Sequence, residues 1–175
     1  MATVGFFSGF LDSGGGLELY ELAMASGLRA RGWDVALAYH EDGDLTAAWR
    51  QVASRMERIE GGASVDLALA PDGVAARQLD VVYLHSPSLM PEGLEAARRM
   101  GVPAVVHLHL PPDGLRDGWK GRLRGRRRAG HPDEAIIDPD SPVVKFLAVS
   151  QYLADQWAQY GVAPELLSVV HNGVD

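Results

Sequence analysis

The sequence predicts an α/β fold built on a parallel β-sheet, because short apolar runs alternate with longer amphipathic segments along the chain. Glycines at positions 32 and 101 follow two of the amphipathic segments, where they would end helices. Strands that alternate with helices form βαβ units with right-handed crossovers. We therefore expect a Rossmann-like parallel sheet with helices on both of its faces.

The first third of the chain predicts a strand, a helix, a second strand and a second helix. Residues 3–8 form a short apolar run that leads into a glycine. Residues 16–31 carry leucine and alanine at near-helical spacing, and arginines suit the final turn. Residues 33–40 are apolar on both faces, as in a buried strand. Asp44 is placed to cap a helix that ends near residue 55.

After a less regular stretch at 56–79, the same alternation returns. A strong apolar run, a proline-containing loop and a helical segment come in turn, and the pattern is then repeated. We expect strands at 79–85, 104–110, 146–150 and 167–170, and helices at 91–100 and 151–160.

Length and composition favour one cytoplasmic domain. The chain has 175 residues, enough for a core that folds alone, and no cysteine for a disulfide, a thiolate nucleophile or a cysteine-based zinc site. Its start lacks the basic and apolar regions of a signal peptide, and no apolar run could span a bilayer. The net charge of −7 argues against general nucleic-acid binding.

Histidines gather where predicted strands end, the edge at which open parallel sheets bind ligands. Five of the six histidines lie at or near such ends: His40, His85, His107, His109 and His171. Since side chains alternate along a strand, His107 faces the same side as His109 but lies deeper, and we expect it to be a hydrogen-bonded core residue. The pair with His85 could suggest a metal site, but no carboxylate accompanies them at ligand spacing, so we expect no metal.

Gly14, Gly15 and Gly16 follow the first predicted strand and open the first helix. Free N–H groups and the helix dipole favour a phosphate at such a place, although a flexible turn would need the same residues. The dinucleotide fingerprint fails because Leu19 stands at its last glycine position. Glu41, after the second strand, could act as the ribose-binding acid, so an NAD(P)-dependent oxidoreductase domain remains a weaker alternative.

The end of the chain and the glycine loop resemble retaining glycosyltransferases of family four, which have the two-domain GT-B fold. Residues 148–175 give strand, helix and short strand before Asn-Gly-Val-Asp, similar to the hinge that leaves the first domain of those enzymes. Residues 14–18 are similar to their Gly-Gly loop. The resemblance implies that Gly15 and Gly16 contact the donor diphosphate and that Glu18 faces the acceptor.

Two strands carry the resemblance further. Residues 103–109 are similar to the family strand that ends in the active-site histidine, which implies that His109 binds donor hydroxyls and supports the developing oxocarbenium ion. Residues 80–85 resemble the strand that ends in a histidine beside the same pocket, here His85.

The resemblance implies that residues 1–175 are the N-terminal, acceptor-side domain of an enzyme whose C-terminal domain, absent here, binds most of the donor. The implied reaction moves a sugar from a nucleotide-diphosphate sugar to an acceptor with retention, and needs no cofactor or metal. The domain alone is expected to be inactive and to expose its interdomain surface, which favours self-association. A free-standing Rossmann-like binding module is the main alternative.

A basic segment lies between residues 115 and 128. Residues 116–128 contain seven Lys and Arg and one acid, a local charge of +6, which leaves −13 for the rest of the chain. An apolar stripe of Leu115, Trp119 and Leu123 runs through it at helical spacing, but three glycines weaken the helix. We expect its arginines, Arg126 and Arg127 among them, to bind an anionic acceptor or an anionic membrane surface. A solvated loop without such a role is an equal alternative.

Overall fold

A computed structural model describes residues 1–59, 79–85, 90–112 and 140–173 of the chain. The strands within these ranges are β1 (Thr3–Phe10), β2 (Asp34–Glu41), β3 (Arg55–Arg58), β4 (Val81–Leu84), β5 (Ala104–Leu108), β6 (Val143–Ala148) and β7 (Leu167–Val169). The helices are α1 (Gly16–Ala30), α2 (Thr46–Val52), α4 (Met90–Met100) and α8 (Gln151–Tyr160), with a 3-10 turn, η3 (Pro164–Leu166).

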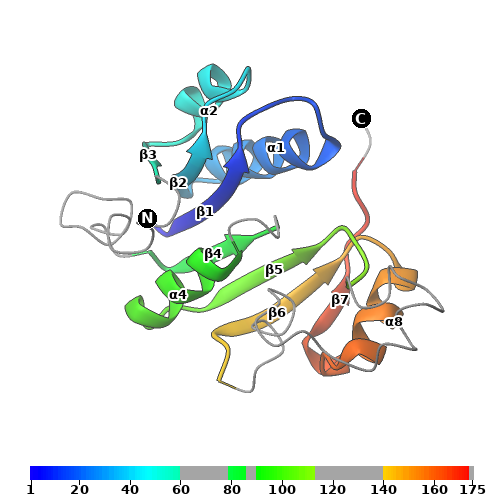
Figure 1. The fold of residues 1–175 in the computed structure, drawn as a ribbon. Coiled ribbons are helices and arrows are strands. Elements are labelled where there is room, and N and C mark those ends of the chain that lie inside the picture. Colours follow the sequence, from blue (N-terminus) through cyan, green and yellow to red (C-terminus); the bar gives the residue numbers. More distant parts are fainter. Residues whose placement is uncertain (60–78, 86–89, 113–139, 174–175) are drawn as a thin grey trace.

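The seven described strands form one parallel sheet in the order β3-β2-β1-β4-β5-β6-β7 (Figure 1). The chain first moves outward from β1 to β2 and β3, and then returns to place β4 on the other side of β1. The sheet therefore reverses its winding between β1 and β4, and the predicted α/β fold with a Rossmann-like parallel sheet is confirmed.

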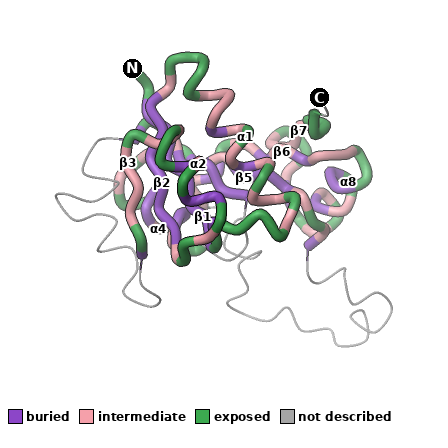
Figure 2. The backbone as a smooth tube through the Cα atoms, turned by 90° about the horizontal axis from the view of Figure 1, so that it is seen from above, coloured by how far each residue is buried: buried purple, intermediate pink, exposed green. Residues whose placement is uncertain are grey.

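The two faces of the sheet bury different side chains. Val35 and Leu37 of β2 pack toward α1 and α2, whereas Ala36 and Ala38 pack toward α4. This alternation is the one expected of a strand that is covered on both faces. Figure 2 shows β1 and β2 buried along nearly their whole length.

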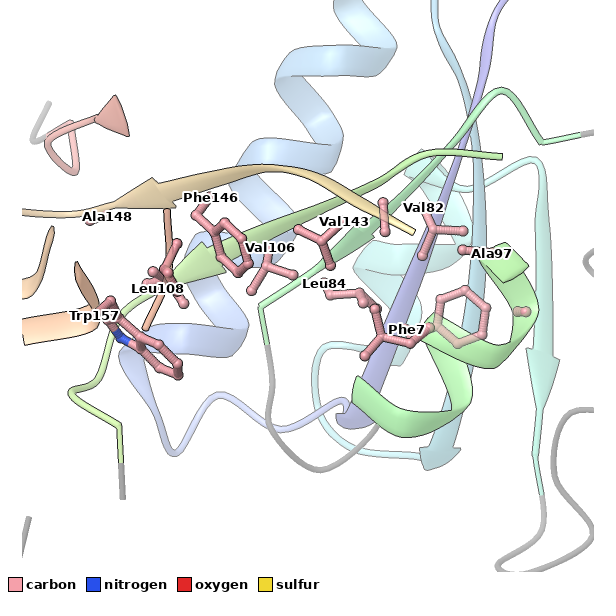
Figure 3. Packing of buried hydrophobic residues seen from close by; sticks show 14 of the residues in the cluster. Phe7, Val82, Leu84, Ala97, Val106, Leu108, Val143, Phe146, Ala148 and Trp157 are labelled. Carbon is pink, nitrogen blue, oxygen red and sulfur yellow. The ribbon is translucent and has the colours of Figure 1, made fainter. Parts of the chain in front are cut away.

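The larger of the two cores lies under α4 and α8. Figure 3 shows Phe7 and Leu84 against α4 at one end and Trp157 of α8 below Leu108 at the other. The Trp157 indole also donates a hydrogen bond of 2.9 Å to the main-chain oxygen of Leu110. This bond joins α8 to the segment that follows β5 and so helps to hold the carboxyl end of β5 in place.

Helix α1 buries only part of the leucine and alanine pattern that indicates it in the sequence, since Leu22 and Leu28 pack against the core. Leu19 is 48% exposed, and Ala23 is exposed as well. The side that faces the sheet follows helical spacing through residues that are buried or partly buried: Leu17, Tyr20, Glu21, Met24, Ala25 and Leu28. A glutamate therefore sits in the middle of the buried stripe.

Three boundary predictions need correction. Asp44 does not cap α2, whose N-cap is Leu45, because its carboxylate accepts hydrogen bonds from the main chain and hydroxyl of Ser13. Strand β6 begins at Val143, three residues earlier than expected, because Lys145 is accommodated with its ammonium 3.3 Å from a main-chain oxygen of the β6–β7 connection. Helix α2 ends at Val52 and not near residue 55, because strand β3 begins at Arg55. Most of the irregular stretch after β3 lies outside the described residues.

Helix ends follow the predictions more closely. Gly32 and Gly101 have φ of 86° and 65°, a region that L side chains avoid, and each follows the end of a helix as expected. Helix α8 has the predicted bounds, and the Ser150 hydroxyl caps it by accepting from the Leu153 N–H at 3.2 Å. Among the described residues, no helix is long and apolar enough to cross a membrane.

Candidate functional site

The predicted site residues lie at the carboxyl edge of the sheet, around the point where its winding reverses. The glycine loop joins β1 to α1, His85 follows β4, and His109 follows β5. Strands β1, β4 and β5 are neighbours in the sheet, so residues far apart in the sequence meet here. Arg126 and Arg127 lie outside the described residues.

Three histidine rings contact one another at this edge. The His107 and His109 ring centroids are 4.5 Å apart, and the His85 ring stands edge-on to His109 at 5.9 Å. His85 and His107 are buried, with 4% and 1% of their surface exposed, whereas His109 is half-buried. We call His85, His107 and His109 the histidine cluster.

Tyrosines from the sheet and from α1 pack against the histidine cluster. The Tyr20 ring lies edge-on to His107 and His109, with centroid distances of 5.1 and 4.9 Å. The Tyr83 hydroxyl oxygen lies 2.6 Å from His107 Nδ1, which confirms that His107 is a hydrogen-bonded core residue. Tyr20 of α1 therefore packs against both His107 and His109, and Tyr83 of the neighbouring strand β4 hydrogen-bonds to His107.

Burial keeps His107 of β5 and His109, which follows it, neutral. It lowers the pKa of His107 to about 4, with a further contribution from the charge of His85. It lowers the pKa of His109 to about 3, followed by the charges of His107 and His85. Burial also raises the pKa of Tyr83, so its hydroxyl keeps its proton. At pH 7, His109 is therefore an uncharged imidazole that can donate or accept a hydrogen bond.

Glu21, in the buried stripe of α1, is the main residue that the sequence analysis missed. Its carboxylate is fully buried, and Oε1 lies 2.9 Å from His85 Nδ1. The approach is an ion-pair contact without hydrogen-bond alignment, and neither group has an aligned partner elsewhere in the described residues. A signal was present in the sequence, because Glu21 shares the helical face of Leu17, Met24 and Leu28.

The glycine loop is anchored from the β2–α2 connection. The Ser13 N–H donates to Asp44 at 2.6 Å, and the Leu45 N–H donates to the main-chain oxygen of Leu11 at 2.9 Å. Gly43 has no room for a side chain, since a Cβ there would lie 2.1 Å from that same oxygen. These contacts hold the chain just before the three glycines in one place.

Gly15 is the N-cap of α1, and no side chain caps the helix. A Cβ on Gly15 would lie 2.3 Å from the Glu18 carboxylate, whereas Gly14 and Gly16 have open space on that side. The Glu18 side chain thus folds back over Gly15. Within the described part of the chain, no side chain accepts from the first N–H groups of α1, which is the arrangement that suits a bound anion.

The chain matches the model of one enzyme family, described as Glycosyltransferase Family 4, over residues 14–175. The chain belongs to glycosyltransferase family 4. A search of curated proteins found no match. The match begins in the glycine loop and includes every element from α1 to β7.

Solved structures share the fold of this family 4 chain. The chain is 21% identical to Anabaena Alr3699/HepE in complex with UDP-glucose, with a TM-score of 0.69. The matched region covers 100% of this chain and 45% of the HepE chain. A glycosyltransferase from Rickettsia africae ESF-5 is 13% identical, with a TM-score of 0.67 and coverages of 99% and 44%. The apo form of the lipopolysaccharide outer core galactosyltransferase WaaB is 13% identical, with a TM-score of 0.63 and coverages of 98% and 46%.

This chain therefore spans less than half the length of each of these three structures. The family membership predicted from the glycine loop, the histidine strands and the final residues is confirmed. Among the described residues, no three histidines, cysteines or carboxylates are placed together as metal ligands.

Proposed function

We propose that this chain is the acceptor-side domain of a retaining glycosyltransferase that transfers a sugar from a nucleotide-diphosphate donor to an acceptor. The observation that carries the proposal is the family 4 match together with the position of the glycine loop and His109. Both lie at the carboxyl edge of the sheet, after β1 and β5, which flank β4, and a donor bound across this edge could contact both.

The uncapped start of α1 would bind the donor diphosphate. No described side chain accepts a hydrogen bond from the N–H groups of Gly15 and Gly16, and the helix dipole favours negative charge at this end. As the bond to the sugar breaks, charge grows on the leaving diphosphate, so fixed N–H dipoles there stabilise the transition state more than the ground state.

His109 would contact the transferred sugar. Sugar transfer with retention develops positive charge on the ring, and a protonated histidine beside it would oppose that charge. Because the pKa of His109 lies near 3, its ring stays neutral and can bind a sugar hydroxyl without repelling the developing cation. Its Nε2 is buried and has no hydrogen-bond partner among the described residues, so its hydrogen-bonding capacity is unused.

Glu18 and His85 would complete the site on the acceptor side. Glu18 lies over Gly15, beside the predicted diphosphate position, where an acceptor hydroxyl could reach it. His85 contacts His109 from the neighbouring strand and is too buried to meet a large acceptor directly, so it would shape the pocket. Arg126 and Arg127 remain our candidates for an anionic acceptor.

The first test is sugar transfer by the protein expressed from its natural reading frame. UDP-glucose is the first donor to try, since HepE binds it, and the anomeric configuration of the product would be read by proton NMR. We expect His109→Ala to reduce kcat/KM by about 100-fold, the size expected for one transition-state contact. His40→Ala removes a histidine at the end of β2 and serves as the matched control.

Equal activity in His109→Ala and His40→Ala would contradict the assigned role of His109, and an inverted product would contradict retention. A second test uses the 175-residue chain alone. We expect it to be inactive and to bind nucleotide sugars weakly, because most donor contacts would lie in a further domain. Tight binding of a nucleotide sugar in isothermal titration calorimetry would refute the proposal that most donor contacts lie in a further domain.

A further inference from the structure

Glu21 is a buried carboxylate that the proposed reaction does not use. It has none of its surface exposed, and its described polar neighbour is His85, itself buried. A carboxylate without a partner is costly to bury, and the cost falls only when a proton or a positive charge lies beside it. The contact with His85 is therefore what makes a glutamate tolerable in the buried stripe of α1.

The contact determines where His85 holds a proton. A carboxylate oxygen can only accept, and two lone pairs 2.9 Å apart would repel each other. A proton on His85 Nδ1 removes this repulsion and gives the Glu21 carboxylate a favourable neighbour, even though the N–H is not aligned for a hydrogen bond. Without the carboxylate, a proton on Nδ1 would lose the negative charge that stabilises it there.

His107 holds its proton on the opposite nitrogen. The Tyr83 hydroxyl has no acceptor among the described residues other than His107 Nδ1, at 2.6 Å, so Tyr83 donates and Nδ1 accepts. The neutral His107 ring then carries its proton on Nε2. The two buried histidines are thus fixed in opposite protonation patterns by partners on α1 and on β4.

His109 packs between these two fixed rings. Its ring centroid is 4.5 Å from that of His107 and 5.9 Å from that of His85, and Tyr20 lies edge-on to it at 4.9 Å. Tyr20 and Glu21 are consecutive residues of α1. The first turns of α1 therefore hold His109 directly through Tyr20 and indirectly through the Glu21–His85 pair.

We propose that Glu21 is a positioning residue for His109: it fixes the proton on His85 Nδ1, and the His85 ring so held fixes the orientation of the His109 ring. The effect on the reaction rests on the proposed function, whereas the proton arrangement does not. Glu21 touches neither donor nor acceptor in this scheme and acts through His85 alone.

Nuclear magnetic resonance of the histidine rings tests the arrangement without any substrate. In the wild-type chain at pH 7, nitrogen shifts should report a proton on His85 Nδ1 and on His107 Nε2, with contacts between the His109 and Tyr20 rings. Glu21→Gln should move the His85 Nδ1 proton signal and weaken those ring contacts. Glu95→Gln, at a carboxylate on α4 paired with arginines, makes the same chemical change away from the cluster and should leave both as in the wild type.

An unprotonated His85 Nδ1 in the wild-type chain would overturn the proposal even if Glu21→Gln did not fold. A shifted His85 signal with unchanged contacts between His109 and Tyr20 would overturn the positioning role. Either result is read from the rings and is independent of sugar transfer.

Kinetics of the active protein test the consequence. Glu21→Gln should lower kcat about tenfold with the donor KM changed less than about threefold, since ring orientation matters most in the transition state. In a His109→Ala background the same substitution should have little further effect. If the kcat losses of the two substitutions simply added in the double variant, Glu21 would act independently of His109 and the proposal would be refuted. If the wild-type protein transferred no sugar, the proposed function would be refuted, and the ring measurements alone would test the role of Glu21.

Discussion

Lowering the pH from 7 to 5 should destabilise the fold, because two histidines are held neutral inside it. The pKa of His107 is about 4 and that of His109 about 3 in the folded chain, against an ordinary value of 6.5. Above pH 6.5 the folded and unfolded chains bind the same number of protons at these rings. As the pH falls from 6.5 toward 4, the unfolded chain binds more protons, so the free energy of unfolding falls.

The size of the effect follows from the two pKa values. At pH 5 the shift of His107 costs about 2 kcal/mol of stability by proton linkage. His109 is half-buried, so solvent screening reduces its share, and the two rings together cost about 3 kcal/mol. That is a large part of the roughly 5–15 kcal/mol by which domains are usually stable.

Urea unfolding at pH 7 and pH 5, followed by tryptophan fluorescence, measures this loss. His107→Asn keeps an acceptor near the Tyr83 hydroxyl but cannot titrate, so the loss between the two pH values should shrink from about 3 to about 1 kcal/mol. His40→Asn, at the end of β2, controls for the removal of an imidazole away from the cluster. The reasoning is refuted if His107→Asn and the wild type lose the same stability.

Three further predictions concern the parts of the fold that support the site, and each is checked by urea unfolding. Trp157→Phe should cost about 1–2 kcal/mol, because the buried indole bond to the Leu110 oxygen is lost, and an unchanged midpoint would refute the role of that bond. Ser150→Ala should cost about 1 kcal/mol through loss of the cap on the Leu153 N–H, and Thr at the same position should restore most of it. Gly43→Ala should cost about 1–3 kcal/mol, since the new methyl meets a main-chain oxygen at 2.1 Å, and a stable variant would mean that the loop before the glycines can move aside.

Much of the fold could be predicted because local patterns and the sheet agree. The sequence predicts α8 with its correct bounds, 151–160, and the alternation of Val35 to Ala38 predicts a strand covered on both sides. Lys145 hides the start of β6, since a charged residue within an apolar run looks like a boundary in sequence alone. Its main-chain acceptor comes from a segment twenty residues later, which no local pattern reveals.

The site could be predicted only in part, because some of its contacts also join residues that are far apart in the sequence. Histidines at strand ends are visible in the sequence, and the parallel sheet brings His85 and His109 together as expected. Glu21 contacts a buried histidine 64 residues away, and no local sequence pattern identifies that partner. A polar residue inside an apolar stripe was the available signal, and it indicates a buried partner rather than an exposed face.

The reversal of the sheet between β1 and β4 has a consequence for folding. Three residue pairs join these strands in register, Val4–Val81, Gly5–Val82 and Phe6–Tyr83, and together with hydrogen bonds between Thr3 and Asp80 they help connect residues 1–59 to the later described segments. Glu21 and Tyr20 belong to the first half and the histidine cluster to the second, so their contacts cross the same seam. The β1–β4 pairing and the polar cluster are therefore parts of one interface, and loss of the β1–β4 register would separate Tyr20 and Glu21 from the histidines.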